Sequence, residues 1–333
     1  MATHSANGGF SYECILYIPV IIGTVLGIPG TLITMRFYVK RIKSTFTSTP
    51  LFLTCLAVFD MVSLITNIPL VATSVPLFYI DGWKESTDNS IVVYVSRIPK
   101  YWSNMVLLFI GVERVVSVLL PHRMKDIFTR RVGVVSITTL IIVGPVVTFP
   151  LSIEPPMVVV PSNGTITHVR RKAQTLIDPD VYRNLISISS LFYFGIPIVG
   201  VLITNLSLVI VLLYRFKSKR AKNSRTAMTS SQMKELRTTK LVMIVTVIFI
   251  VCVFPLVIIF PVISYSGESV PIGLMLAVRP TSALLETVNY SMNAVVYYIG
   301  SSNFRSETRE IVSRLCCLCK RSEISPLEES NTR

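Results

Sequence analysis

The chain has 333 residues, of which 51% are hydrophobic and only 15% are charged, and its mean hydropathy is +0.62. Soluble globular chains carry roughly 25% charged residues, so this composition excludes a disordered protein, an ordinary cytosolic enzyme and a disulfide-stapled secreted domain. The formal net charge of +14 leaves two explanations. A nucleic-acid-binding protein would carry the basic excess on a soluble domain, whereas a membrane protein would carry it on its cytoplasmic loops.

Seven stretches are long and apolar enough to cross a membrane, which takes about 20 residues in a helix. They are Ile15–Val39, Pro50–Ser74, Ile91–Leu120, Val132–Ser152, Leu185–Tyr214, Leu236–Ser264 and Ile272–Ile299. The third and the seventh contain charged residues and amides, which is typical of helices at the centre of a bundle. The sequence therefore predicts an all-α membrane protein: a seven-transmembrane helix bundle over residues 15–299, a short amphipathic eighth helix over 300–315 and a tail over 316–333.

Lysine and arginine gather on the loops after the first, third and fifth stretches and in the tail, while the loops on the other side contain few. Basic loops stay in the cytoplasm, so we expect a plasma-membrane protein with an extracellular N-terminus (residues 1–14) and a cytoplasmic C-terminus. This topology explains the basic excess without nucleic acid. It also places the acceptor sequence Asn163-Gly164-Thr165 on an outer loop, which predicts glycosylation of Asn163.

Three cysteines follow the expected eighth helix, namely Cys316, Cys317 and Cys319. Juxtamembrane cysteines beside an amphipathic helix predict palmitoylation, which would anchor the helix to the membrane lipids. A zinc site is the alternative, but no histidine lies near these thiols in the sequence, and no metal is expected. Cys14 is the one cysteine expected on the extracellular side, so no extracellular disulfide within the chain is predicted.

Four short motifs appear in order along the apolar stretches. They are Leu56-Ala57-Val58-Phe59-Asp60, Glu113-Arg114-Val115, Cys252-Val253-Phe254-Pro255 and Asn293-Ala294-Val295-Val296-Tyr297. Together they resemble the LAxxD, E/DRY, CWxP and NPxxY motifs of rhodopsin-like G-protein-coupled receptors. The resemblance extends over nearly the whole chain and implies that fold and a receptor function.

Several positions depart from the family pattern. Asn89 stands where the family usually has an outer cysteine, Val253 replaces a tryptophan and Ala294 replaces a proline. These losses indicate a divergent member. The surroundings of Glu113 and of Ile127-Phe128-Thr129 are similar to chemosensory receptors of gastropods and also to invertebrate neuropeptide receptors, and the sequence does not separate the two.

The resemblance implies activation of a heterotrimeric G protein by conformational change. The residues expected to serve coupling and switching are Glu113, Arg114, Pro255, Asn293 and Tyr297. In the closed bundle we expect the Glu113 carboxylate to hold the Arg114 guanidinium and to release it when the sixth helix moves outward. The alternative is an arginine that merely extends to the lipid headgroups.

Family spacing places Asp60 in the middle of the bundle with Ser103, Asn289 and Asn293. A carboxylate surrounded by hydroxyl and amide oxygens suits a sodium ion, which would favour the resting state. The alternative is a protonated aspartate that forms hydrogen bonds in the core. A possible allosteric sodium ion is the one cofactor expected.

Candidate ligand-contacting residues lie in the outer halves of the third, fifth, sixth and seventh stretches, namely Ser96, Arg97, Lys100, Tyr193, Phe254 and Glu286. Arg97 and Lys100 are about one helical turn apart, so they share a face. If that face lines the cavity, the cavity is cationic and favours an anionic ligand or an acidic peptide. Alternatively, Glu286 pairs with Lys100 inside the protein and Arg97 extends outward.

The sequence therefore predicts a receptor for a chemosensory cue or a neuropeptide, not an enzyme, since no catalytic constellation is evident. A polytopic transporter is the alternative function. Transporters usually contain internal repeats or paired broken helices, and neither is visible in the sequence.

Overall fold

The computed structural model describes residues 10–42, 47–74, 90–120, 123–152, 157–162, 165–171, 178–221, 230–265 and 270–314. Its main helices are α1 (Phe10–Ile42), α2 (Thr49–Ser74), α4 (Ser90–Leu119), α6 (Arg130–Ser152), α8 (Ile196–Ala221), α9 (Ser230–Tyr265) and α10 (Ile272–Gly300). A short α5 (Met124–Ile127) precedes α6, and α7 (Pro179–Ser190) runs through the π-helical turn η2 (Leu191–Gly195) into α8. The long apolar runs fold as helices because a helix satisfies its own backbone hydrogen bonds in lipid.

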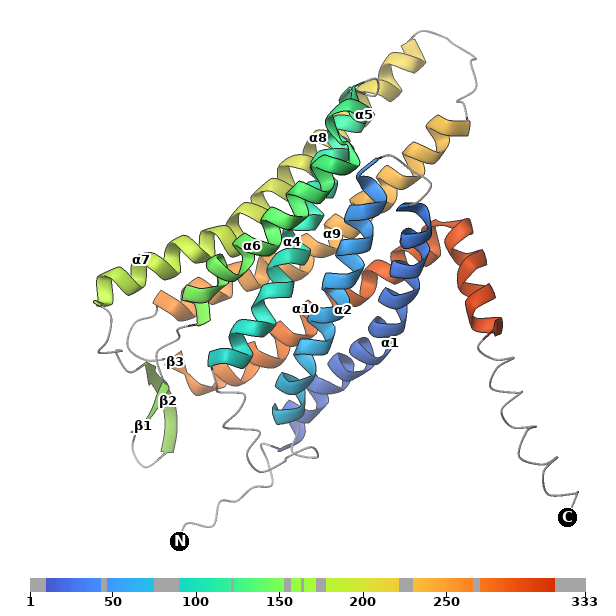
Figure 1. Cartoon of the computed structure of the whole chain (residues 1–333). Helices are drawn as coiled ribbons and strands as arrows, with labels where there is room; N and C mark the ends of the chain where they lie inside the picture. The colour runs from blue at the N-terminus through green and yellow to red at the C-terminus, as the bar shows by residue number, and fades with distance from the viewer. Residues whose placement is uncertain are drawn as a thin grey trace, which may run out of the picture.

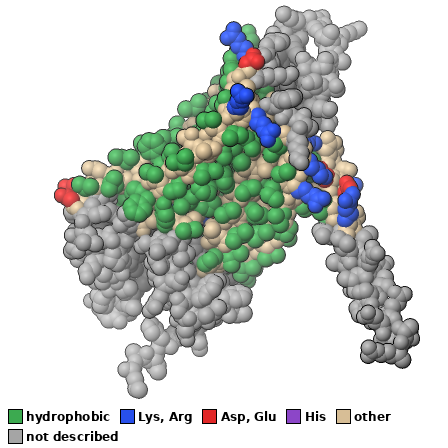
Figure 2. All heavy atoms as spheres, in the orientation of Figure 1, with side chains coloured by type: hydrophobic (Ala, Val, Ile, Leu, Met, Phe, Trp, Pro, Cys, Tyr) green, Lys and Arg blue, Asp and Glu red, His purple; other side chains and the backbone are tan. Residues whose placement is uncertain are grey.

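The helices form one bundle, as the sequence predicts (Figure 1). Within the described residues, six of them have the length and apolar composition to cross a membrane. The seventh, α10, is more polar, and it packs against α1, α2 and α9. In Figure 2, hydrophobic side chains cover the visible face between the ends of the bundle. This is the surface of a multi-pass membrane protein.

The two ends of the bundle differ in structure. At one end, which we call the Arg114 end, α1 and α4 terminate and α2 and α6 begin. At the other, the hairpin end, strands β1 (Met157–Ser162) and β2 (Thr165–Arg171) form an antiparallel hairpin, and β3 (Val270–Pro271) pairs with β2. This sheet was not expected from the sequence, although the dipeptide Asn163-Gly164, which is typical of tight hairpins, stands between the sequences of its first two strands.

The helix over residues 302–314 turns sharply from the end of α10 and starts beside α1 at the Arg114 end of the bundle. Phe304 is 2% exposed and packs edge-on against Phe37 of α1, with ring centroids 5.1 Å apart. Lys40 of α1 also forms an ion pair with Glu307. One buried aromatic contact and one ion pair therefore attach the expected eighth helix to α1.

Trp102 of α4 fixes the position of α6. Its indole Nε1 donates a hydrogen bond of 3.0 Å to the Leu140 carbonyl, and the ring lies directly against Gly144, where a Cβ atom would overlap it.

We expect Gly144→Leu to lower the free energy of unfolding by about 1–3 kcal/mol, because overpacking forces the rigid indole to move. Thermal unfolding of the purified protein in detergent measures this. Val143→Leu, at an exposed neighbouring position, should change little, and equal stability of the two variants would contradict this packing.

Candidate functional site

A buried carboxylate joins three helices at the middle of the bundle. Asp60 of α2 is 1% exposed, and its Oδ1 accepts a hydrogen bond of 2.5 Å from Ser103 of α4. Its Oδ2 accepts a hydrogen bond of 2.6 Å from the Asn293 side-chain amide of α10. Both donors are themselves buried. We call these three residues the clamp, since they connect α2, α4 and α10 at one level.

The clamp presents only part of the ligand set that a sodium ion needs, so the sodium ion stays a prediction. Each Asp60 carboxylate oxygen accepts one hydrogen bond and keeps a further lone pair. Asn293, however, turns its N–H group to the carboxylate, and an N–H group is a donor and not a metal ligand. Asn289 is buried on α10, and no described hydrogen bond joins it to Asp60. A cation would enter only after the Asn293 amide turned away. The same contacts explain how the carboxylate is held without one.

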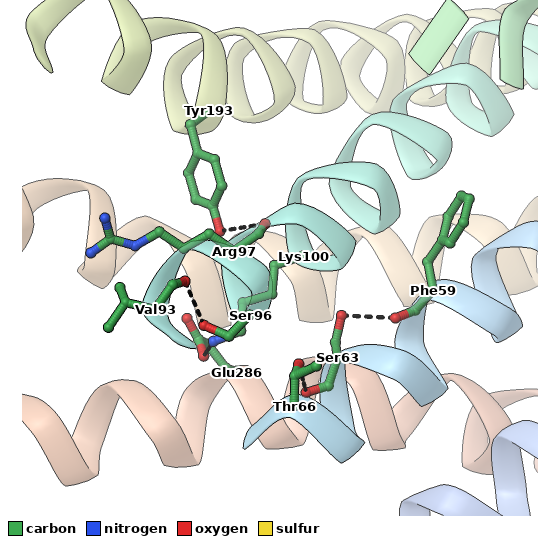
Figure 3. Close-up of polar contacts among 9 residues, drawn as sticks. All are labelled: Phe59, Ser63, Thr66, Val93, Ser96, Arg97, Lys100, Tyr193 and Glu286. Atoms are coloured by element: carbon green, nitrogen blue, oxygen red, sulfur yellow. Dashed lines mark hydrogen bonds and ion pairs between the residues drawn. The ribbon is translucent and has the colours of Figure 1, made fainter. Parts of the chain in front are cut away.

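A second polar layer lies nearer the hairpin end. Lys100 of α4 donates to Glu286 of α10 with an Nζ–Oε2 distance of 2.5 Å, and their side chains are 7% and 24% exposed. Figure 3 shows the pair between the two helices. An ion pair in a low-dielectric bundle holds its partners strongly, because separating them leaves a buried charge. Here the predicted internal pairing of Glu286 is the arrangement found, so the positive charge of Lys100 is neutralised.

Arg97 lies one turn along α4 from this pair. The Tyr193 hydroxyl donates to the Arg97 carbonyl over 3.4 Å, and the Tyr193 ring stacks on Tyr101 with centroids 6.1 Å apart. In Figure 3 the Arg97 guanidinium points away from Lys100 and Glu286. The Ser96 hydroxyl donates within its own helix, to the Val93 carbonyl. The two cationic side chains of α4 therefore do not form one joint cationic site.

At the Arg114 end, Glu113 accepts hydrogen bonds from the chain at the start of α2 and forms none with the adjacent Arg114. Its Oε1 accepts hydrogen bonds from the hydroxyls of Ser48 (2.8 Å) and Thr49 (2.7 Å). The expected ion pair with Arg114 is not formed, so that expectation was wrong for this conformation. Adjacent residues of a helix point about 100° apart, and α2 lies on the side of α4 that Glu113 faces.

Arg114 is 6% exposed, and its Nε has no hydrogen-bond partner. It lies within electrostatic range of the hydroxyls of Tyr38 and Tyr297, and Tyr297 is 3% exposed. Arg114 is thus enclosed by the bundle and does not extend outward to a membrane surface. Its guanidinium retains hydrogen-bonding capacity that a partner entering this end could use.

Comparison with known proteins decides what kind of molecule this is. Residues 31–297 match the family model of the 7 transmembrane receptor (rhodopsin family). The chain belongs to the rhodopsin family of seven-transmembrane receptors. It is also 24% identical over 319 residues to galanin receptor 2b of Danio rerio, an alignment that covers 92% of this chain and 77% of that protein. The family makes the chain a receptor and not an enzyme.

Two expected site residues lie outside the arrangement just described. Phe254 of the receptor is 49% exposed on the outside of α9, whereas the preceding Val253 is buried at 6%. The expectation that Phe254 lines the cavity was therefore wrong, because the inward face of α9 falls at Val253. Pro255 lies within α9, and α9 shows no described break there.

Other expected sites lie outside the described residues: Asn163, Cys316, Cys317 and Cys319. Sequence reasoning also missed Ser48 and Thr49, the partners of Glu113. Two adjacent hydroxyl residues at the start of an expected helix were the available signal, since such residues commonly form hydrogen bonds at helix starts. The partner that they found is on another helix, which no local pattern predicts.

Proposed function

We propose that the receptor binds an extracellular ligand at the hairpin end and activates a heterotrimeric G protein at the Arg114 end. The observation that carries this proposal is the polar path along α4. This path consists of three side chains of α4: Lys100 in the polar layer nearer the hairpin end, Ser103 in the clamp, and Arg114 at the opposite end. A shift of α4 against α10 therefore acts on all three levels, which is how ligand binding can bias a distant site.

The charge distribution supports an orientation with the Arg114 end in the cytoplasm of a plasma-membrane receptor. Described basic residues cluster at this end, and they include Lys40, Arg41, Arg123, Arg130, Arg131, Arg305, Arg309 and Arg314. In Figure 2 the visible lysine and arginine side chains gather on that side. A glycan on Asn163 and palmitate on Cys316, Cys317 and Cys319 are compatible with the same orientation.

Galanin is the first ligand to test, because the similar receptor of Danio rerio is named for it. The experiment measures intracellular calcium in cells that express the receptor with a promiscuous Gα subunit. The panel contains galanin, fractionated neural peptides, and waterborne carboxylates and amino acids, so it separates neuropeptide from chemosensory use. Cells without the receptor and surface labelling of the receptor provide the controls.

The same panel is then applied to cells that lack Gα subunits. We expect the response to disappear, because the receptor has no other route to calcium release in this proposal. A response that persists in the absence of Gα subunits would contradict G-protein coupling. It would favour the alternative function, a transporter or channel.

A further inference from the structure

Among the described residues, the Lys100–Glu286 ion pair joins two helices in the half of the bundle nearer the hairpin end. Ionised side chains at this depth are costly unless they are paired. Lys100 lies about one turn nearer the hairpin end than Ser103, and Glu286 lies about two turns nearer than Asn293. The pair therefore fastens α4 to α10 directly above the clamp.

Two buried asparagine side chains, one on α4 and one on α2, have amide oxygens without a hydrogen-bond partner. The Oδ1 atom of Asn104, one turn from Lys100 on the same side of α4, is buried without a hydrogen-bond partner. Asn67 of α2 is 2% exposed, and neither its Oδ1 nor its Nδ2 has a partner. Asn67 is about two turns from Asp60 on the same face of α2 and nearer the hairpin end, which is the direction in which Lys100 and Glu286 lie from the clamp. Buried amide oxygens without donors can accept from an ammonium group that leaves its carboxylate.

The two members of the pair are unequally accessible. Glu286 is 24% exposed at its side chain and Lys100 only 7%, so a ligand group meets the carboxylate first. A cation that takes Glu286 leaves that carboxylate paired and lets the displaced lysine turn to Asn104. An anion that takes Lys100 would leave Glu286 as an unpaired charge in a low-dielectric site.

We propose that the Lys100–Glu286 pair is a lock between α4 and α10, which a cationic group of the ligand opens by taking the Glu286 carboxylate from Lys100. The ligand therefore carries an ammonium or guanidinium group, such as a basic residue of a peptide. This inference rests on the proposed receptor function. It differs from the anionic ligand expected from the sequence, because Lys100 is already neutralised.

The first test measures ligand-free nucleotide exchange on a G protein in membranes that contain each variant. Lys100→Ala and Glu286→Gln should each raise basal exchange by about fivefold or more, the lower range of coupling between conformational states. The charge swap Lys100→Glu with Glu286→Lys should return exchange to the wild-type level. Val95→Ala, at an exposed position of α4, is the control. Single variants with wild-type exchange would overturn the lock.

If a single variant fails to reach the cell surface, the swap decides the outcome. Recovery of surface expression in the swap supports the pair, because only the relative placement of opposite charges is then restored. If the swap does not recover surface expression, the broken ion pair is not the cause of the loss in the single variant, and the pairing is overturned. This readout needs no G protein, so it remains informative if the receptor proves not to couple.

The second test uses propylammonium as a probe of Glu286. Lys100→Ala removes the native cation, and propylammonium is expected to raise its thermal unfolding temperature by pairing with Glu286. Its basal exchange should stay high, because a cation that is not attached to α4 does not reconnect the two helices. Propionate should not stabilise this variant, and Lys100→Ala with Glu286→Gln should not respond to propylammonium. Stabilisation by propionate, or no stabilisation by propylammonium, would overturn Glu286 as an accessible site for a cation.

Discussion

Arg114→Ala is expected to reduce ligand-stimulated nucleotide exchange on the G protein by at least about 30-fold. Truncating one member of a charged contact costs about 2–5 kcal/mol, and 2 kcal/mol already corresponds to that factor. Arg114 is buried at the end of the polar path along α4, and Glu113 does not engage it. Its hydrogen-bonding capacity is thus available to a partner helix when the bundle opens. Exchange assays on membranes with matched receptor levels measure the effect.

Two control variants separate this role from a general basic charge at the same end. Arg123→Ala removes an exposed basic residue and should reduce exchange far less. Arg114→Lys keeps the charge but loses the planar set of five donors, so it should recover only part of the activity. Full activity of Arg114→Ala would show that this residue does not contact the G protein.

Asp60→Leu is expected to be the most damaging change in the clamp, since it leaves the donors of Ser103 and Asn293 without an acceptor in the core. Hydrogen bonds to a charged group contribute about 1.5–3 kcal/mol each, and Asp60 accepts two. We expect a loss of about 3–6 kcal/mol, measured as loss of surface expression and of thermal stability in detergent.

The reciprocal exchange Asp60→Asn with Asn293→Asp provides a matched control. The aspartate on α10 then accepts from the asparagine amide on α2, and the asparagine oxygen accepts from Ser103. We expect this double variant to be more stable than Asn293→Asp alone, because that single change places two carboxylates against each other, whereas the double variant restores a donor opposite each acceptor. Additive losses in the double variant would mean that the two side chains do not interact.

The helices were predictable from the sequence because each is a long apolar run with polar boundaries. The predicted stretch Pro50–Ser74, for example, is close to α2 at Thr49–Ser74. Two of the three contacts expected for Asp60 were also found, since family spacing fixes which helical turns lie at one level. Asn289 lies near that level, yet no described bond joins it to the carboxylate.

Side-chain direction was the part that the sequence could not supply. Glu113 and Arg114 are adjacent in the chain, but helical geometry turns one to α2 and leaves the other in the bundle. Phe254 was expected to face the cavity, but the inward position of that turn is Val253. The pairing of Lys100 with Glu286 stayed undecided, because it depends on how α4 and α10 are rotated toward each other. In the sheet, only the pairing of β2 with β3 depends on residues that are distant in the sequence.

The most direct test of the receptor function is the rate of GDP release from a purified heterotrimeric G protein. The receptor is placed in lipid nanodiscs, and the compound active in the calcium assay is added. We predict that the wild-type receptor accelerates GDP release well above empty nanodiscs and that Arg114→Ala does not. A wild-type rate equal to that of empty nanodiscs, with the compound shown to bind the receptor, would contradict the proposed function.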